Sequence, residues 1–372
     1  MLVPLVKKTG KSLHMPEELE RMPFITSEAI ETAQVMKQAA RAHRQLAELK
    51  GAATTIPNES ILIDTLALQE AKDSSEIENI ITTQDELYQG DRFASRYPSL
   101  STKEVHNYSA ALNLGFERIR SKRFLRLQDV LDIQGALLES RSGIRTLPGT
   151  VLKSQTTGEV VYEPPQNREE IESLLSNFLD YFNLDDDSAG IDPLIRMSLL
   201  HHQFESIHPF YDGNGRTGRI LNLLFLTLHD LLGIPVLYLS RYIVRNKDAY
   251  YRLLQTARDE NEWEAWTLYL LKAVEETARE TLSQVEGIRE LMRKTKNELR
   301  SKLPKIYSQD LLNNLFRHPY TKIEFIVRDL NVSRPTAMKY LALLDEQGVV
   351  EKVKLGRTNF YINHALFSLL TS

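Results

Sequence analysis

Apolar residues recur with the period of an α-helix through most of the chain, and this pattern constrains the fold more than any other feature. Between residues 171 and 182, Ile, Leu and Phe follow the i, i+3, i+4, i+7 spacing of an amphipathic helix. Asp192 and Pro193 supply a helix cap and a first-turn proline, and Pro209 ends that helix. A further helix is expected near residues 215–228. The sequence therefore predicts a mainly α fold.

Two short β-prone runs interrupt the helical pattern, at residues 150–153 and 160–162. Thr157 and Gly158 separate them with turn residues, and a proline pair ends the second run. This arrangement predicts a β-hairpin inside the helical domain. The hairpin is either a surface excursion or an exposed strand edge that pairs with the backbone of another chain.

The pattern changes again after a charged helix at residues 285–303, which ends before Pro304 and is expected to be a linker. Three short amphipathic segments and two strand-like runs follow, at residues 311–315, 323–330, 333–344, 349–350 and 358–362. Three helices and a two-stranded wing predict a winged helix-turn-helix unit.

The composition excludes several kinds of site. The 372 residues include no cysteine, which excludes disulfides, thiolate metal ligands and cysteine nucleophiles. The formal net charge is −4, but residues 301–372 carry 10 Lys and Arg against 6 Asp and Glu, so a mildly basic end follows an acidic body. Polar residues interrupt the richest apolar stretch, residues 220–239, which predicts a buried helix rather than a membrane span. We expect a cytoplasmic protein with no membrane association.

The segment with the most chemical information is His208-Pro-Phe-Tyr-Asp-Gly-Asn-Gly-Arg-Thr-Gly-Arg219, between two expected helices. A helix N-terminus offers free N–H groups and partial positive charge to an anion. Arg216 and Arg219 share one face of its first turns, where cations are unfavourable unless a multiply charged anion binds among them. Asp212 is a hard oxygen ligand for Mg²⁺, and a histidine such as His208 suits general base catalysis. These residues predict phosphoryl or nucleotidyl transfer.

Two alternatives explain this segment less well. Gly213, Gly215 and Gly218 match the dinucleotide-binding fingerprint, but that motif follows a strand, and here a helical pattern precedes it. A plain structural turn would explain the glycines, but it would not explain Asp212 together with the two arginines.

The segment resembles the motif of the Fic family, His-Pro-Phe-x-Asp/Glu-Gly-Asn-Gly-Arg-x-x-Arg, at every specified position. The surrounding helices and hairpin are similar to the family from about residue 101 to residue 278. The resemblance implies a Fic-fold helical core in which the hairpin is the flap that aligns a target segment by strand addition. It also implies transfer of AMP from ATP to a hydroxyl side chain of a target protein, and of the protein itself, with release of pyrophosphate.

The resemblance implies roles for individual residues as well. His208 would deprotonate the acceptor hydroxyl, Asp212 would hold Mg²⁺, and Arg216 and Arg219 would bind the β- and γ-phosphates. The other residues expected to bind ATP are Gly213, Asn214, Gly215, Thr217, Gly218, Asn246 and Tyr250. The last two fit ordinary helix surface and core equally well.

A second, shorter match lies far upstream, at Ser74-Ser-Glu-Ile-Glu78-Asn79. It resembles the inhibitory motif of the family, Ser/Thr-x-x-x-Glu-Gly/Asn, and its Ser and Glu are spaced to lie on one helix face. The resemblance implies that Glu78 pairs with Arg219, and that ATP then binds with its α-phosphate misplaced. A displacement of about 1 Å can lower a rate on the order of a hundredfold. An autoinhibited enzyme is therefore expected, although some Fic proteins with such a glutamate also remove AMP.

These interpretations divide the chain at residues 1–100, 101–278, 279–304 and 305–372. The parts are an N-terminal helical region with the inhibitory helix, a Fic core, a linker helix and the winged helix. The winged helix carries basic residues at the start of its third helix and on its wing: Arg334, Lys339, Lys352, Lys354 and Arg357. They suit DNA contacts, but the unit suits protein docking equally well.

Other functions stay open at this point. The chief competitor is a DNA-binding regulator whose Fic site senses nucleotide, although an intact His208 favours catalysis. A hydrolase that removes AMP, and transfer of phosphate or phosphocholine, are further alternatives. The family resemblance also implies a homodimer.

Overall fold

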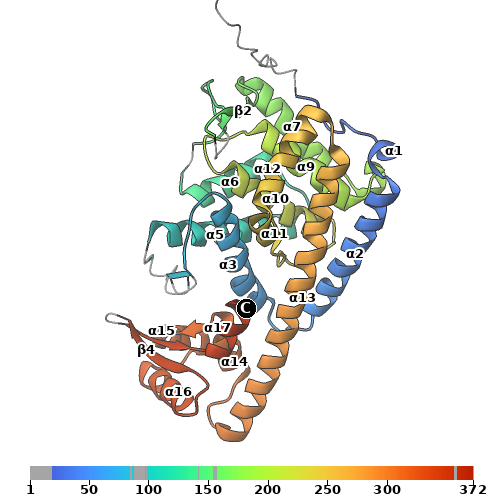
Figure 1. Cartoon of the computed structure of the whole chain (residues 1–372). Helices are drawn as coiled ribbons and strands as arrows, with labels where there is room; N and C mark the ends of the chain where they lie inside the picture. The colour runs from blue at the N-terminus through green and yellow to red at the C-terminus, as the bar shows by residue number, and fades with distance from the viewer. Residues whose placement is uncertain are drawn as a thin grey trace, which may run out of the picture.

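The computed structural model describes residues 19–83, 86–87, 97, 99–140, 142–153, 157–355 and 358–371. Within them the fold is mainly helical, with two small antiparallel sheets (Figure 1). Arg357, which the sequence analysis assigns to the wing, lies outside the described residues. None of the described helices is both long and apolar enough to cross a membrane.

Two long helices, α2 (Ala33–Ala53) and α13 (Trp263–Lys302), pack along each other at one side of the molecule (Figure 1). The Thr32 side chain caps α2 by accepting a hydrogen bond from the Val35 N–H, after the short helix α1 (Ser27–Ile30). The buried residues of α2 follow helical spacing, and so form one apolar stripe: Val35, Ala39, Ala42, Leu46 and Leu49.

The helix α3 (Glu59–Ile77) lies against α5 (Leu100–Lys122) and α11 (Leu239–Arg245). Apolar residues on several sides of α3 are buried, among them Ile61, Leu66 and Ala71. A helix that is buried on several faces belongs to the interior of a domain. The expected inhibitory segment is the C-terminal end of this helix.

The helix α10 (Asn214–Leu228) packs against α3, α5, α6 and α9 and is buried along nearly its whole length. The remaining helices of the core are α6 (Leu127–Leu138), α7 (Arg168–Asn183), α8 (Asp186–Ala189), α9 (Pro193–Ile207) and α12 (Lys247–Glu260). The expected limits of α9 are confirmed. Asp192 caps it by accepting hydrogen bonds from the N–H groups of Leu194 and Ile195, and the helix ends two residues before Pro209.

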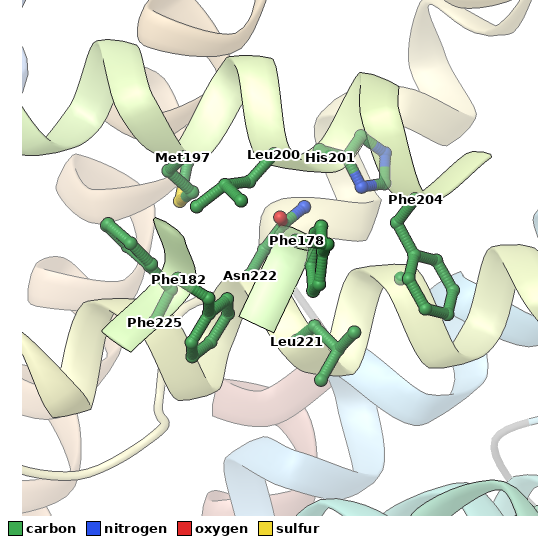
Figure 2. Close-up of a pocket in the computed structure, with 10 residues that line it drawn as sticks. Phe178, Phe182, Met197, Leu200, His201, Phe204, Leu221, Asn222 and Phe225 are labelled. Carbon is green, nitrogen blue, oxygen red and sulfur yellow. The ribbon is translucent and has the colours of Figure 1, made fainter. Parts of the chain in front are cut away.

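The core between α7, α9 and α10 is aromatic. Figure 2 shows Phe178, Phe182 and Phe225 around a gap that Asn222 and His201 also line. The gap is too narrow to hold a water molecule, and its lining is almost entirely apolar. We therefore assign it to the packed interior and not to a ligand site.

The expected hairpin is present and is held on α12. The strands β1 (Leu152–Lys153) and β2 (Val160–Tyr162) pair in antiparallel orientation. The Gln255 Nε2 donates to the Val161 carbonyl at 2.9 Å, and the Arg258 guanidinium lies 3.6 Å from the centre of the Tyr162 ring. The contacts from α12 fix the base of the hairpin, while the Val160 and Val161 side chains stay exposed.

The C-terminal unit contains more elements than the sequence analysis expects. Its helices are α14 (Gln309–Arg317), α15 (Ile323–Leu330), α16 (Arg334–Glu346) and α17 (His364–Thr371). Its sheet has the order β3-β5-β4, with β3 (Tyr320–Thr321), β4 (Glu351–Leu355) and β5 (Thr358–Ile362). The strand expected at residues 349–350 begins two residues later. The two-residue strand β3 forms only through pairing with β5, a tertiary contact that local sequence does not encode.

The helix α13 runs without a break across residue 279, where the linker was expected to begin. Contacts of α17 and α14 fix the C-terminal unit to the rest of the chain. The α17 helix packs on α13 at Gly287, where an added Cβ would lie 2.6 Å from Leu369 Cδ1. The Arg317 Nε donates to Asp64 Oδ2 at 2.6 Å and joins α14 to α3. The C-terminal unit therefore contacts α3 directly.

A buried carboxylate at the start of α6 yields a stability prediction. Asp129 is fully buried, and it accepts hydrogen bonds from the Arg126 N–H and from the side chains of Arg126, Arg118 and Lys122. Although burial opposes the charge, these donors lower the pKa of Asp129 to about 2. We expect Asp129→Asn to lower the free energy of unfolding at pH 7 by about 2 kcal/mol in urea titrations.

The pH dependence of that loss has a definite sign. The pKa of Asp129 is lower in the folded than in the unfolded chain, so its contribution is complete above about pH 4 and disappears as the pH falls toward 2. The difference between wild type and Asp129→Asn should shrink over that range. Asp132→Asn, which removes a partly exposed partner of the same Arg118, should cost less at pH 7. Equal costs for both variants would contradict the analysis.

Candidate active site

The loop between α9 and α10 is held in one conformation by its own residues. His208 caps α9 in the left-handed region, at φ 48°, and its N–H donates to the Phe204 carbonyl. The Asn214 side chain spans the loop, because its Oδ1 accepts from the Phe210 N–H at 2.9 Å and its Nδ2 donates to the Phe210 carbonyl at 2.8 Å. Both polar groups of Asn214 are thus used to shape the loop.

Arg145 supports the same loop from the segment before the hairpin. Its Nε donates to the His208 carbonyl at 2.8 Å, its Nη2 donates to the Pro165 carbonyl, and its backbone N–H donates to the Pro209 carbonyl. The Arg145 side chain is buried. Every one of these bonds ends on a backbone carbonyl, so Arg145 fixes the path of the chain through His208.

The His208 imidazole is neutral near pH 7. Burial and the nearby Arg145 charge lower the pKa of His208 to about 4. Its Nδ1 is buried and has no hydrogen-bond partner among the described residues. A neutral imidazole of this kind is ready to accept a proton.

The N-terminus of α10 favours an anion. Gly213 precedes the helix at φ 79° and provides no side-chain cap. The N–H groups of residues 214–216 have no carbonyl partner within the helix, as in any first helical turn. These N–H groups and the helix dipole together favour a negatively charged group at this end.

Arg216 lies buried beside this helix end and bridges two carboxylates. Its Nη1 donates to Glu104 Oε2 at 2.9 Å, and its Nη2 lies 3.5 Å from Asp212 Oδ1. The Asp212 side chain is 71% exposed, so its carboxylate faces solvent next to the open helix end. The structure thus brings Asp212 and Arg216 together.

Arg219 is 1% exposed, and all its partners lie at the C-terminal end of α3. Its Nε donates to Ser74 Oγ at 2.8 Å, and its Nη2 donates to the Ser74 carbonyl and to Glu78 Oε1, each at 2.9 Å. Burial alone would lower the pKa of Arg219, but Glu78 and the surrounding tyrosines raise it above its ordinary value. The guanidinium is therefore charged and paired.

The Glu78 carboxylate covers the first turn of α10. An added Cβ on Gly215 would collide with Glu78 Oε1 and lie 3.0 Å from Arg219 Nη1. A side chain at residue 215 would push the Glu78 carboxylate out of this position. Glu78 thus occupies the anion site that the helix end and Arg219 create.

An open groove lies next to this region. It has a volume of about 720 Å³ and runs between α5 and α6, where Gln134 and Asp132 line it. The Gln134 Nε2 is 3.4 Å from the Asp212 carbonyl, so the groove adjoins the loop without containing His208 or Arg219.

The other residues expected to bind ATP make contacts within the protein. Thr217 is buried, and Gly218 packs against α9, where an added Cβ would lie 2.8 Å from Glu205 Oε1. Asn246 joins α11 to α12, and its Nδ2 donates to the Tyr242 carbonyl at 2.9 Å. The buried Tyr250 hydroxyl lies 2.9 Å from His201 Nε2. The side chains of Asn246 and Tyr250 are thus engaged within the protein.

Sequence reasoning missed two residues that shape the site, Arg145 and Glu104. Each acts through a contact with a segment more than 60 positions away, and neither lies in a recognisable local pattern. A signal for them would require knowledge of the tertiary fold.

The site fits Mg²⁺ in one restricted sense. Among the residues that the structure describes, no group of three or more His, Asp or Glu side chains could hold a metal ion. Mg²⁺ is, however, commonly held by one or two carboxylates together with substrate phosphates. The exposed Asp212, beside an anion site, suits that arrangement.

Three family models match separate parts of the chain. Residues 36–117 match the model described as Fic/DOC family N-terminal, and residues 124–226 match the model described as Fic/DOC family. Residues 291–366 match the model described as protein adenylyltransferase SoFic-like, C-terminal domain. The second match contains the loop and ends two residues before the end of α10.

Curated relatives match shorter stretches. The chain is 34% identical over 94 residues to protein adenylyltransferase fic-1 of Caenorhabditis elegans. The matched stretch covers 25% of this chain and 17% of that protein. The chain is 25% identical over 160 residues to protein adenylyltransferase Fic of Drosophila willistoni, which covers 42% of this chain and 30% of that protein. The chain therefore spans less than a third of these relatives' length.

Solved structures share the fold. A Fic family protein from Desulfovibrio desulfuricans G20 is 18% identical and has a TM-score of 0.54, with 89% of this chain and 96% of that chain covered. Fic-1 (residues 134–508) from C. elegans is 22% identical and has a TM-score of 0.52. The match covers 69% of this chain and 76% of that chain. With its two Fic/DOC matches and the complete twelve-residue segment, the chain belongs to the Fic/DOC family.

Proposed function

We propose that the protein is an adenylyltransferase, which moves AMP from ATP to a hydroxyl side chain of a target protein and of itself. One observation carries the proposal: the uncapped N-terminus of α10 stands between the buried arginines Arg216 and Arg219 and follows the neutral His208. This arrangement suits a polyphosphate beside a base. The names of the curated relatives, protein adenylyltransferase, favour AMP as the transferred group.

The proposed reaction assigns each group a task. His208 accepts the proton of the target hydroxyl, whose oxygen attacks the α-phosphorus of ATP. The bond from that phosphorus to the bridging oxygen breaks, and pyrophosphate leaves. The N–H groups at the start of α10 stabilise the charge on the phosphate oxygens, and Arg216 and Arg219 hold the departing phosphates.

Asp212 would hold Mg²⁺ together with the phosphates. The ion would neutralise phosphate charge and help to orient the polyphosphate. Arg216 keeps the Asp212 carboxylate near the helix end, because it lies between Asp212 and Glu104.

We further propose that the enzyme is autoinhibited by Glu78. Its carboxylate pairs with Arg219 and covers Gly215, where the terminal phosphate of ATP would otherwise bind. ATP that binds beside Glu78 would hold its α-phosphate away from the line of attack. The same carboxylate could orient water toward an AMP-modified side chain, so removal of AMP is the alternative activity of this site.

The C-terminal unit supports a second, separate function: we propose that it is a winged helix that binds DNA. An exposed stripe of α16 contains Met338, Lys339 and Ala342, and the β4 residues Lys352 and Lys354 are also exposed. Small and basic residues on one exposed helix, beside a basic strand, suit a groove and its phosphates.

The first prediction from the proposed function concerns label transfer. Wild type, Glu78→Gly and His208→Ala are incubated with Mg²⁺ and ATP labelled at the α- or the γ-phosphate, and protein-bound label is measured. We expect label from the α position only, at least about tenfold more with Glu78→Gly because Arg219 is released, and none with His208→Ala. Glu76→Gln is the matched control, since the ion pair of Glu76 within the described part of the chain is with Lys72 on its own helix.

Other results would have distinct meanings. Label from the γ position would make the protein a kinase-like enzyme. Equal or lower labelling by a folded Glu78→Gly variant would contradict autoinhibition. Faster release of AMP from labelled protein by wild type than by Glu78→Gly would favour the hydrolase.

The second prediction concerns pH. Because the pKa of His208 is lowered to about 4, its imidazole stays neutral well below pH 7. The labelling rate of Glu78→Gly at low ATP should therefore change little between pH 7.5 and 5.5. A histidine with an ordinary pKa of about 6.5 would lose about tenfold in rate at pH 5.5. A decline centred near pH 6.5, with the protein still folded by circular dichroism, would contradict the neutral, buried base.

The third prediction concerns DNA. The full chain should bind a random 20-base-pair duplex in fluorescence anisotropy, more weakly as salt rises. Lys354→Ala should reduce the slope of log affinity against log salt by about 0.9, the value for one phosphate contact. Lys305→Ala, an exposed lysine before α14, should leave the slope unchanged. An absence of binding at low salt would exclude DNA and leave protein docking.

A further inference from the structure

A buried carboxyl group on α3 has no part in the reaction proposed above. Glu70 is 1% exposed and lies two helical turns before Glu78. Glu70, Ser74 and Glu78 are spaced four residues apart, so they follow one face of the helix. Ser74 and Glu78 contact Arg219, whereas Glu70 contacts other elements.

Glu70 joins three helices. Its Oε2 accepts from the Ser240 N–H of α11 at 3.0 Å, and its Oε1 hydrogen bonds with the Ser240 hydroxyl. The Tyr108 hydroxyl of α5 donates to the same Oε1 at 3.2 Å. Both oxygens of the carboxyl group are thus engaged, and α5 and α11 each supply a partner.

The same contacts reach the inhibitory pair. The Tyr108 hydroxyl lies beside Ser74, whose Oγ accepts from Arg219 Nε. Glu70 is therefore close to the inhibitory pair through Tyr108 and through the shared helix face. A rotation of α3 that broke the bonds of Glu70 would also move Ser74 and Glu78, because all three share one face.

Apolar packing alone does not define the rotation of α3. Burial of Ile61, Leu66 and Ala71 stabilises the helix, but apolar contacts are not directional. A buried carboxyl group that loses its partners is costly, and this cost penalises every orientation but one. Burial raises the pKa of Glu70 to about 8, which makes the group mainly neutral at pH 7. An uncharged amide could then make comparable hydrogen bonds.

We infer that Glu70 is a positioning residue, which fixes α3 against α5 and α11 so that Glu78 reaches Arg219. The inference rests on the proposed autoinhibition. It assigns Glu70 no contact with ATP or with the acceptor. Its effect on the reaction passes through Glu78 alone.

The test measures self-labelling from α-labelled ATP by the full chain. Glu70→Ala removes the hydrogen bonds and should raise labelling at least about fivefold, toward the level of Glu78→Gly. Glu70→Gln can replace the bonds to Ser240 and should stay within about twofold of wild type. The double variant Glu70→Ala with Glu78→Gly should match Glu78→Gly alone, because Glu70 then has nothing left to position.

The outcomes separate this inference from the proposed function. Activation by Glu78→Gly without activation by Glu70→Ala overturns the inference only. No activation by Glu78→Gly overturns the proposed autoinhibition and the inference with it. A double variant that labels faster than Glu78→Gly alone also overturns the inference, because the effect then bypasses Glu78.

If Glu70→Ala does not fold, which would appear as loss of its thermal transition, a second pair of variants replaces it. Ser240→Ala and Tyr108→Phe remove one hydroxyl each and leave the carboxyl group in place. Combined, they should activate labelling in the presence of Glu78 and not in its absence. Glu76→Gln, at a partly exposed position on the same helix, should change nothing. Unchanged labelling by the folded combined variant overturns the inference.

Discussion

The buried charge of Arg219 determines how α3 and α10 meet. A guanidinium group with 1% exposure is costly unless its donors are satisfied, and here Ser74 and Glu78 satisfy them. The first turn of α10 adds its own preference for an anion at the same place. A carboxylate fills that place in this structure, and a phosphate has the same sign of charge and similar acceptor oxygens. The physical features that close the site are thus those that would bind a nucleotide.

The loop before α10 is specified as strongly as the ion pair. His208 has a positive φ, which is unusual for a residue other than glycine and is retained only where the surroundings enforce it. Asn214 fixes the loop from within, and Arg145 donates hydrogen bonds to the carbonyls of His208 and Pro209 in the loop. The position of His208 therefore depends on Asn214 and Arg145, whose side chains bond to the backbone of the loop and not to the imidazole. Such support is expected where a base must be held in one position.

Local signals in the sequence predict those parts of the fold that local physics determines. Asp192, Pro193 and Pro209 define α9 because caps and prolines act on neighbouring backbone. The contact of Glu78 with Arg219 joins residues 141 positions apart, and only the family resemblance pointed to it. Arg145, Glu104 and Glu70 could not be found, because their partners lie on other elements. Helical spacing could not distinguish a buried Tyr250 from one that faces a ligand, since both share the apolar face of α12.

The 40 residues of α13 form one continuous helix, about 60 Å long at 1.5 Å per residue. The helix packs against α2 in the core and carries α17 of the C-terminal unit at Gly287. Because Arg317 binds Asp64, the C-terminal unit contacts α3 as well as α13. It is therefore joined to the core at more than one place, and not by α13 alone. A tilt of one degree over 60 Å shifts the far end by about 1 Å. A displacement of the C-terminal unit would thus reach α3, the helix whose C-cap is Glu78, through the Arg317–Asp64 contact.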